Sequence, residues 1–233
     1  MEKIKIFYDG VSLDFIKNEG RNLIDGVTTT PTLMKSEGIK NFETFSRNLI
    51  QIIPDKAVSL EVFSDDLVGM RDQAIKINSW GSNVFIKIPI SNSEGTSTKS
   101  LIRELLNEGL KLNVTAIFTL DQVKSISECF DGYDSNILSI FAGRIADTGI
   151  DPVNIIKNIS NHLSTNNLNL DLLWASSREV FNVVQANESG CNIITLNQEL
   201  IKKLKYFNKN LLEFSLETVQ MFKNDAEKAG YKI

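Results

Sequence analysis

The residue best suited to do chemistry in this sequence is Lys87, inside the run Val84-Phe85-Ile86-Lys87-Ile88-Pro89. Apolar residues continue on both sides of it without polar alternation, which predicts a strand buried on both faces. A charged lysine is costly to bury without a partner, so we expect burial to favour the uncharged amine. An uncharged amine attacks carbonyl carbons and forms a Schiff base with them. The alternative is a lysine whose charged end reaches solvent at the end of the strand.

Polar and charged side chains also follow the ends of other strand-like runs. In a barrel of parallel strands, catalytic residues gather at the C-terminal strand ends. Taken singly, these residues have ordinary explanations as turn residues, strand threonines or halves of surface ion pairs. A random scatter of charges would not favour one end of the strands, so their shared position predicts an active site. They are Asp9, Thr30, Glu61, Lys87, Thr115, Ser139 with Arg144, and Ser176 with Arg178.

Schiff-base chemistry at Lys87 gives several of these residues a task. Formation and dehydration of the carbinolamine require a proton to move to and from the departing oxygen, and Glu61 is the candidate acid, acting through water if necessary. Carbon–carbon cleavage leaves an enamine and needs a base for the adjacent hydroxyl proton, for which Asp9 is the candidate. Thr115 can hold the relay water or a substrate hydroxyl.

Two arginines and two serines predict an anion-binding clamp at the same strand ends. Arg144 and Arg178 carry guanidinium groups whose fork matches phosphate oxygens, and Ser139 and Ser176 add hydroxyl donors. Arg178 is also expected at the start of a helix, where the helix dipole favours an anion. The alternative for each arginine is a surface ion pair of little energetic weight.

Short apolar runs and longer amphipathic segments alternate along the chain, which predicts strands separated by helices. The first connection, from Gly10 to Asp25, is brief, so its helix must be short or distorted. Helices are predicted over Ser64–Asn78, Gly95–Asn107, Arg178–Asn187, Asn197–Tyr206 and Leu211–Ala229, with another that begins at Asp151-Pro152. Strands are predicted over Ile4–Asp9, Gly26–Thr30, Val58–Phe63, Val84–Pro89, Leu112–Phe118, Ile137–Ile145, Leu170–Ser176 and Asn192–Leu196.

This order of elements predicts an α/β fold, a single-domain (β/α)8 TIM barrel with an extra C-terminal helix at about residues 211–229. Strands that alternate with helices form a parallel sheet, and eight such units in a chain of this length favour closure into a barrel over residues 1–233. A doubly wound open sheet is the alternative. Its usual glycine-rich phosphate loop is missing, because the sequence has neither a G-x-G-x-x-G pattern nor a Walker A motif.

Composition narrows the class of protein and its partners. Of the 233 residues 42% are hydrophobic, which is ordinary for a soluble globular domain. The net charge of −4 gives no electrostatic reason to expect a nucleic-acid partner. The sequence contains no run of about 18 apolar residues that would predict a membrane span, and we expect no signal peptide. The two cysteines, Cys129 and Cys191, lack metal-ligand spacing, so we expect a cytoplasmic protein with no metal site.

Five segments of the sequence resemble those of a known family, the transaldolases, especially the small single-domain bacterial form that also includes fructose-6-phosphate aldolase. The segment GVTTTP from Gly26 is similar to the family's GVTTNP, and VFIKIP from Val84 resembles its Schiff-base strand. The segment NVTAIFT from Asn113 resembles its threonine strand. The last two, SIFAGRIADTG from Ser139 and LLWASSRE from Leu172, resemble its S-P-F-V-G-R-I-D and A-S-F-R segments.

The resemblance implies a role for each matched residue. Lys87 corresponds to the Schiff-base lysine, Asp9 to the aspartate after the first strand and Glu61 to the acid/base glutamate. Asn113 matches an active-site asparagine. The phosphate-binding positions fall on Arg144, Ser176 and Arg178. The resemblance implies sugar phosphates as the substrates and no metal or organic cofactor.

Two residues favour the transaldolase branch of the family, and a third departs from both branches. The aldolase branch tends to carry glutamine where this chain has Glu61, and tyrosine where it has Phe141. The family's asparagine in TTNP, which hydrogen-bonds the hydroxyketone part of the donor, is Thr30 here. A hydroxyl has a shorter reach than an amide, so Thr30 is expected to alter donor selectivity.

Three functions follow from these observations. The first is a transaldolase that transfers a dihydroxyacetone unit from a ketose phosphate to an aldose phosphate. The second is an aldolase that releases free dihydroxyacetone or acts on an unusual sugar phosphate. The third is a non-catalytic sugar-phosphate-binding relative, although binding alone does not require Asp9, Glu61, Lys87 and Thr115.

The C-terminal segment from Leu211 to Ile233 is amphipathic. Its apolar residues Leu212, Leu216, Val219 and Phe222 recur at helical spacing. The simplest explanation is a helix that closes the barrel. The family resemblance implies instead that the helix reaches a neighbouring subunit, and therefore that the protein is a homo-oligomer.

Overall fold

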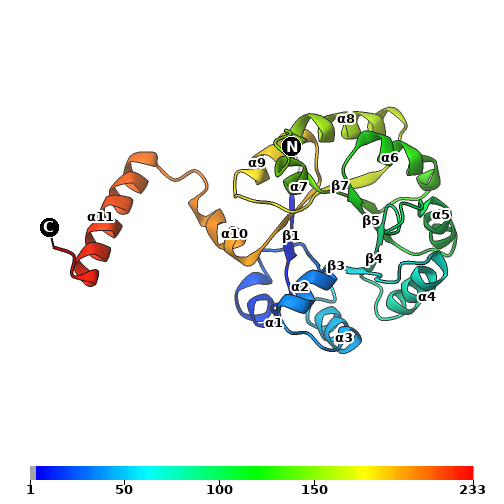
Figure 1. The fold of residues 1–233 in the computed structure, drawn as a ribbon, viewed down its shortest axis with the longest axis horizontal. Helices are drawn as coiled ribbons and strands as arrows, with labels where there is room; N and C mark the ends of the chain where they lie inside the picture. Colours follow the sequence, from blue (N-terminus) through cyan, green and yellow to red (C-terminus); the bar gives the residue numbers. More distant parts are fainter. Residues whose placement is uncertain (1–3, 233) are drawn as a thin grey trace. The chain divides into compact units, whose positions relative to one another are not determined.

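Eight parallel strands close into a barrel in the computed structural model, which describes residues 4–232 (Figure 1). The strands pair in chain order, and β8 pairs with β1 to complete the ring. The predicted (β/α)8 barrel is therefore confirmed, and the open sheet is wrong. The strands are β1 (Lys5–Asp9), β2 (Gly26–Thr28), β3 (Ala57–Glu61), β4 (Val84–Pro89), β5 (Leu112–Ile117), β6 (Asn136–Ile140), β7 (Leu170–Trp174) and β8 (Ile193–Leu196).

The prediction of one strand over Ile137–Ile145 is wrong in its second half. Strand β6 ends at Ile140, and the short helix α7 (Ala142–Ala146) follows it at once. A continuous apolar run does not distinguish a buried strand from a buried helical turn, because both bury every side chain. Arg144 therefore lies on a helix and not in a strand.

The helices that connect successive strands cover the outside of the barrel. The first connection holds three helical residues, α1 (Leu13–Phe15), followed by a π-helical turn, η1 (Ile16–Gly20), so the expected short or distorted helix is confirmed. Helices α2 (Pro31–Ser36), α3 (Phe42–Ile52), α6 (Leu120–Ser127) and α7 lie where the sequence pattern did not indicate a helix. The other helical elements around the barrel are α4 (Leu67–Asn78), α5 (Lys99–Asn107), η2 (Glu128–Phe130), α8 (Pro152–Thr165), α9 (Asn182–Ser189) and α10 (Gln198–Lys203).

The prediction that a helix starts at Arg178 is wrong. Helix α9 begins at Asn182, whose Oδ1 accepts hydrogen bonds from the backbone N–H groups of Arg178 and Glu179. This side chain holds the preceding turn in place of a first helical turn. Arg178 consequently lies in the loop between β7 and α9.

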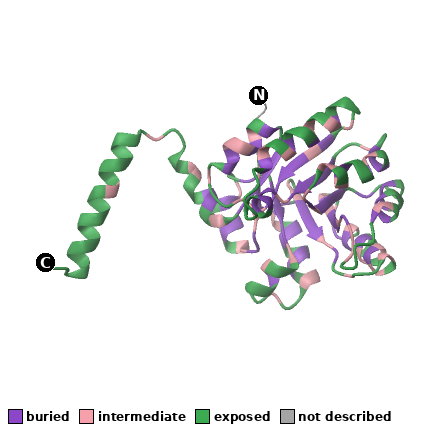
Figure 2. Cartoon of the chain, turned by 45° about the horizontal axis from the view of Figure 1, so that its top comes forward, coloured by how far each residue is buried: buried purple, intermediate pink, exposed green. Residues whose placement is uncertain are grey.

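The core lies inside the barrel and between the barrel and its helices (Figure 2). Strand β4 shows the pattern, since Ile86 and Ile88 are fully buried. Several buried polar residues gather inside the barrel near the C-terminal strand ends. There the buried polar residues include Ser59, Lys87, Asn113, Thr115 and Ser139.

The chain divides into two compact units, residues 1–201 and residues 202–233. The second unit holds η3 (Leu204–Tyr206) and α11 (Leu211–Ala229). The Asn210 side chain caps the start of α11, and Gly230 ends it at φ 69°, a conformation that favours glycine. None of the residues of α11 is buried. That residues 1–233 act as one domain stays a prediction.

Candidate active site

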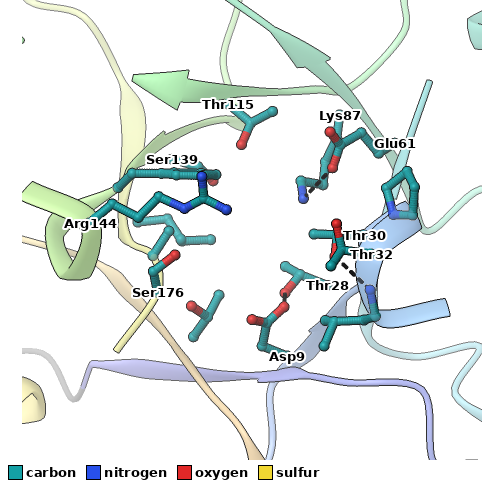
Figure 3. A pocket seen from close by; sticks show the side chains of 16 residues that line it. Asp9, Thr28, Thr30, Thr32, Glu61, Lys87, Thr115, Ser139, Arg144 and Ser176 are labelled. Atoms are coloured by element: carbon teal, nitrogen blue, oxygen red, sulfur yellow. Dashed lines mark hydrogen bonds and ion pairs between the residues drawn. The ribbon is translucent and has the colours of Figure 1, made fainter. Parts of the chain in front are cut away.

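A cavity of about 380 Å³ opens at the C-terminal ends of the strands (Figure 3). The barrel brings together most of the residues that the sequence singled out, although they come from distant parts of the chain. The predicted site residues that line the cavity are Asp9, Thr30, Glu61, Lys87, Thr115, Ser139, Phe141, Arg144 and Ser176.

Lys87 is buried, with 5% of its surface exposed, and its amine faces the cavity. The predicted burial is confirmed, and the alternative of a lysine in solvent is wrong. The pairing of β3 with β4 sets Glu61 beside Lys87, and Nζ of Lys87 lies 2.9 Å from Oε2 of Glu61. Nζ also donates to the backbone carbonyl of Thr29 at 3.2 Å. These partners offset part of the cost of burying the amine, and a carboxylate at this distance can exchange a proton with it.

Asp9 stands across the cavity at the end of β1. The pairing of β1 with β2 sets it beside Thr28, whose hydroxyl donates to Oδ1 of Asp9 at 3.0 Å. Burial raises the pKa of the Asp9 carboxyl above its ordinary value, and the positive charge of Lys87 and the Thr28 hydrogen bond oppose that rise. A carboxylate whose pKa is raised is a stronger base than an ordinary aspartate.

Thr115 presents an unused hydroxyl to the cavity. Its Oγ1 is buried and has no hydrogen-bond partner among residues 4–232. The register of β5 against β6 shifts between Val114 and Ile117, and Ala116 within this interval takes φ 58°. A bulge of this kind changes the direction in which the neighbouring side chains point. Because buried hydroxyls in proteins are nearly always hydrogen-bonded, the Thr115 hydroxyl is suited to bind a ligand atom or a water molecule.

Arg144 reaches the cavity from α7, on the side opposite to Lys87 (Figure 3). Its guanidinium carbon lies 5.4 Å from the ring centre of Phe141. Ser176, at the end of β7, takes φ 63°, which is unusual for a residue other than glycine. The Gly143 backbone N–H donates to the Ala175 carbonyl at 3.2 Å, so α7 lies directly against the end of β7.

Arg178 and Asn113 are predicted site residues that do not line the cavity. Arg178 pairs with Asp147 in a bidentate contact, with Nε 3.0 Å from Oδ1, and about half of its side chain is exposed. The hydrogen bonds between them raise the pKa of Arg178 and lower that of Asp147. Asn113 lies fully buried beneath the cavity, where it contacts Ser59 and Ser139.

Thr30 has a structural task besides its place in the cavity wall. It is the N-cap of α2, and its Oγ1 accepts the Leu33 backbone N–H at 3.2 Å. Pro31 occupies the first helical position, where a proline is well tolerated. One lone pair of the hydroxyl is therefore used within the chain.

Four hydroxyl residues of the site were not singled out from the sequence. Thr28, Thr32 and Thr195 line the cavity, and Ser59 lies beneath it with Asn113. A signal for Thr28 was present, since residues two apart on a strand point to the same side and Thr30 was already a candidate. Ser59 and Thr195 are small hydroxyl residues inside predicted strands, and Thr32 lies outside every predicted element, so these three carry no comparable signal.

The part of the chain that the structure describes carries neither a metal-binding cluster nor a membrane-spanning helix. Within residues 4–232, no group of three or more His, Cys, Asp or Glu side chains is arranged to hold a metal ion. Over the same residues, no helix is both long enough and apolar enough to cross a bilayer.

Comparison with known proteins identifies the family of this chain. The family described as Transaldolase/Fructose-6-phosphate aldolase matches residues 6–233. The chain belongs to this family. Among its relatives is a probable transaldolase of Thermoanaerobacter sp. (strain X514), 32% identical over 231 residues, which covers 99% of this chain and 100% of the relative. Probable transaldolase 2 of Listeria monocytogenes serovar 1/2a is 34% identical over 202 residues, which cover 86% and 88% of the two chains.

Membership of the family identifies the protein as an enzyme of the transaldolase or closely related aldolase type. Solved structures at low sequence identity share its fold. The 3-hexulose-6-phosphate synthase of Salmonella typhimurium superposes with a TM-score of 0.58 at 13% identity, over 83% of this chain and 89% of that one. This likeness is one of barrel architecture.

Proposed function

We propose that this enzyme is a transaldolase that works through a Schiff base on Lys87. It transfers a dihydroxyacetone unit from a ketose phosphate to an aldose phosphate, and it uses no metal or organic cofactor. The observation that carries the proposal is a buried amine with a carboxylate 2.9 Å away, inside a cavity that also holds a second carboxylate and a guanidinium.

In the first half-reaction, Nζ of Lys87 in its uncharged form attacks the ketose carbonyl and gives a carbinolamine. Glu61 protonates the departing hydroxyl, which leaves as water, and an iminium ion remains. Asp9 then takes the proton of the hydroxyl next to the bond that breaks. The electron pair of that carbon–carbon bond moves into the iminium ion, which yields an enamine on Lys87 and a free aldose phosphate.

The second half-reaction reverses these steps with a new acceptor. The enamine carbon attacks the aldehyde of the acceptor, and Asp9 returns its proton to the oxygen that forms. Water then adds to the iminium ion, and the new ketose phosphate is released from Lys87. The Thr115 hydroxyl, which has no partner within the described residues, is suited to hold the water that is lost and regained.

Arg144 and Ser176 are the proposed phosphate ligands. They line the wall of the cavity opposite to Lys87, which suits a sugar phosphate whose carbonyl and phosphate lie at opposite ends (Figure 3). Arg178 is proposed as a further ligand. Its guanidinium pairs with Asp147, so a phosphate would have to compete with that carboxylate.

Reduction of the Schiff base tests the proposal. Borohydride added with a ketose phosphate should attach a three-carbon fragment to the protein, and intact mass and peptide mapping should place it on Lys87. Lys87→Arg keeps the positive charge but cannot form the adduct, so it should remain unlabelled. Labelling of Lys87→Arg at the level of the parent would rule out the mechanism.

The state of Thr30 supports a second candidate, an aldolase that releases free dihydroxyacetone or takes an unusual sugar phosphate. The hydroxyl of Thr30 is already bound to α2, so this position offers less to a donor than an amide would. Steady product release from a donor supplied without acceptor would favour the aldolase. Thr30→Asn keeps a good helix cap and adds an amide, and it should raise ordinary transaldolase activity if Thr30 limits it.

A cytoplasmic homo-oligomer is the proposed state of the enzyme. Both Cys129 and Cys191 are free and buried, which fits a reducing compartment. On α11 the side chains of Leu212, Leu216 and Phe222 are more than half exposed. Exposed apolar surface of this kind is typical of a protein interface, so we propose that α11 packs against another copy of the chain.

A further inference from the structure

A layer of buried polar side chains lies directly beneath the cavity. Ser59 on β3 and Asn113 on β5 are fully buried, and Ser139 on β6 is 2% exposed. Strand β4 runs between β3 and β5 and carries Lys87 at the same level, since Lys87 pairs with Asn113 in the register of β4 and β5. The proposed mechanism gives no task to Ser59, which nevertheless lies two residues before Glu61 on the same strand.

Hydrogen bonds connect these three side chains into a chain. Nδ2 of Asn113 donates to Oγ of Ser59 at 3.1 Å, and Oγ of Ser139 donates to Oδ1 of Asn113 at 2.7 Å. An asparagine amide has one side that only donates and one side that only accepts. Its two neighbours therefore cannot exchange roles unless the amide turns over.

The direction of the hydrogen bond between Ser139 and Asn113 decides what Ser139 offers to a substrate. A serine hydroxyl has one proton, and that of Ser139 is used on Asn113. The remaining lone pairs of Ser139 are on an oxygen that lines the cavity. Ser139 can thus accept a hydrogen bond from a substrate hydroxyl, but it cannot donate one to a phosphate, whose oxygens are acceptors. The expected place of Ser139 in the phosphate clamp does not fit this arrangement.

We propose that Ser59 is a positioning residue, which holds the Asn113 amide with its oxygen toward Ser139 and thereby makes Ser139 an acceptor for a hydroxyl of the donor substrate. The inference rests on the proposed function, because it concerns how that site binds its ketose. Without the Ser59 hydroxyl, the buried NH2 group of Asn113 loses its hydrogen-bond partner, and an unpaired buried donor lowers the stability of that arrangement. The amide can then turn, and the proton of Ser139 is released toward the cavity.

Three variants test this role. Ser59→Ala removes the hydroxyl, and Ser59→Thr keeps it. Ser46→Ala is the matched control, because Ser46 is a fully buried serine on α3 whose Oγ has no hydrogen-bond partner among residues 4–232. For each variant we would measure KM and kcat for a ketose phosphate and the inhibition constant of inorganic phosphate.

Ser59→Ala should raise KM for the ketose phosphate about tenfold, the size expected for one lost buried hydrogen bond, with the phosphate inhibition constant within about twofold of the parent. Ser59→Thr should restore KM to within about threefold, and Ser46→Ala should match the parent. An unchanged KM in Ser59→Ala would overturn the inference. So would an equal weakening of ketose phosphate and inorganic phosphate.

A second measurement does not depend on activity. The side-chain NH2 signals of Asn113, observed by NMR, should exchange slowly with solvent in the parent and in Ser46→Ala, and faster in Ser59→Ala. Equal exchange in Ser59→Ala and the parent would contradict the proposal even if the variants were inactive. Borohydride labelling of the parent reports separately on Lys87, so failure of the Schiff-base mechanism and failure of the Ser59 role can be distinguished.

Discussion

Asp9, Glu61 and Lys87 share one small cavity, and their neighbours determine which proton each can move. Lys87 and Glu61 lie in direct contact, whereas Asp9 accepts a hydrogen bond from Thr28. Burial raises the pKa of Asp9, so Asp9 loses its proton at a higher pH than an ordinary aspartate. A residue that acts as a base must be ionised, and activity should fall as the pH drops through this raised pKa.

Thr28→Val tests this at the residue scale. Valine has the same shape but donates no hydrogen bond, so the ionised form of Asp9 loses stabilisation and its pKa should rise further. The acid limb of kcat for carbon–carbon cleavage should move up by about one pH unit, the equivalent of one hydrogen bond to a charged group. Thr28→Ser keeps the donor and should retain the parent profile. If both variants slow cleavage without moving the limb, Thr28 is only a packing residue.

At the scale of elements, the site depends on how closely α7 approaches β7. The Gly143 N–H donates to the carbonyl of Ala175, and a Cβ added to Gly143 would lie 1.6 Å from the carbonyl oxygen of Ser176. Only glycine permits this contact. Arg144 follows Gly143 in the chain, so the same contact fixes the backbone position from which the Arg144 side chain reaches the cavity.

Gly143→Ala should therefore move α7 and lower the free energy of unfolding by about 1–3 kcal/mol, because backbone and not a flexible side chain blocks the new methyl group. We expect weaker inhibition by inorganic phosphate, but continued borohydride trapping of unphosphorylated dihydroxyacetone on Lys87. Ala146→Gly, at an exposed position of α7, costs about 1 kcal/mol of helix propensity and is the control. Equal effects of the two variants on phosphate inhibition would show that helix stability matters and the close contact does not.

The same junction shows where sequence reasoning reached its limit. Strand β4 and helix α11 have the predicted bounds, since a buried apolar run and a long amphipathic pattern are strong local signals. The turn from β6 into α7 could not be predicted, because Ile140 to Ile145 is apolar except for Arg144 and lacks a helix cap. The Asp147 partner of Arg178 and the Ser59 partner of Asn113 are tertiary contacts over 31 and 54 residues, for which local sequence gives no signal.

At the scale of the whole molecule, closure of the barrel brings together residues that are far apart in the sequence. The pairing of β8 with β1 brings Thr195 and Asp9 to the wall of one cavity, although almost the whole barrel sequence separates them. Residues 202–233 form a unit of their own, and the apolar side chains of α11 are exposed there. A second copy of the chain is the partner proposed to cover this surface.

Val219→Glu combined with Phe222→Glu tests this at the apolar face of α11, where the two side chains are 58% and 62% exposed. Two buried charges without partners would oppose association, so the mass measured by light scattering should fall to that of a smaller species. Gln220→Glu combined with Asn224→Glu adds the same charge to the polar face of the helix and should leave the mass unchanged. Since α11 is not buried, neither pair should lower the unfolding temperature of the barrel. An unchanged mass in the first pair would mean that this face does not form the contact.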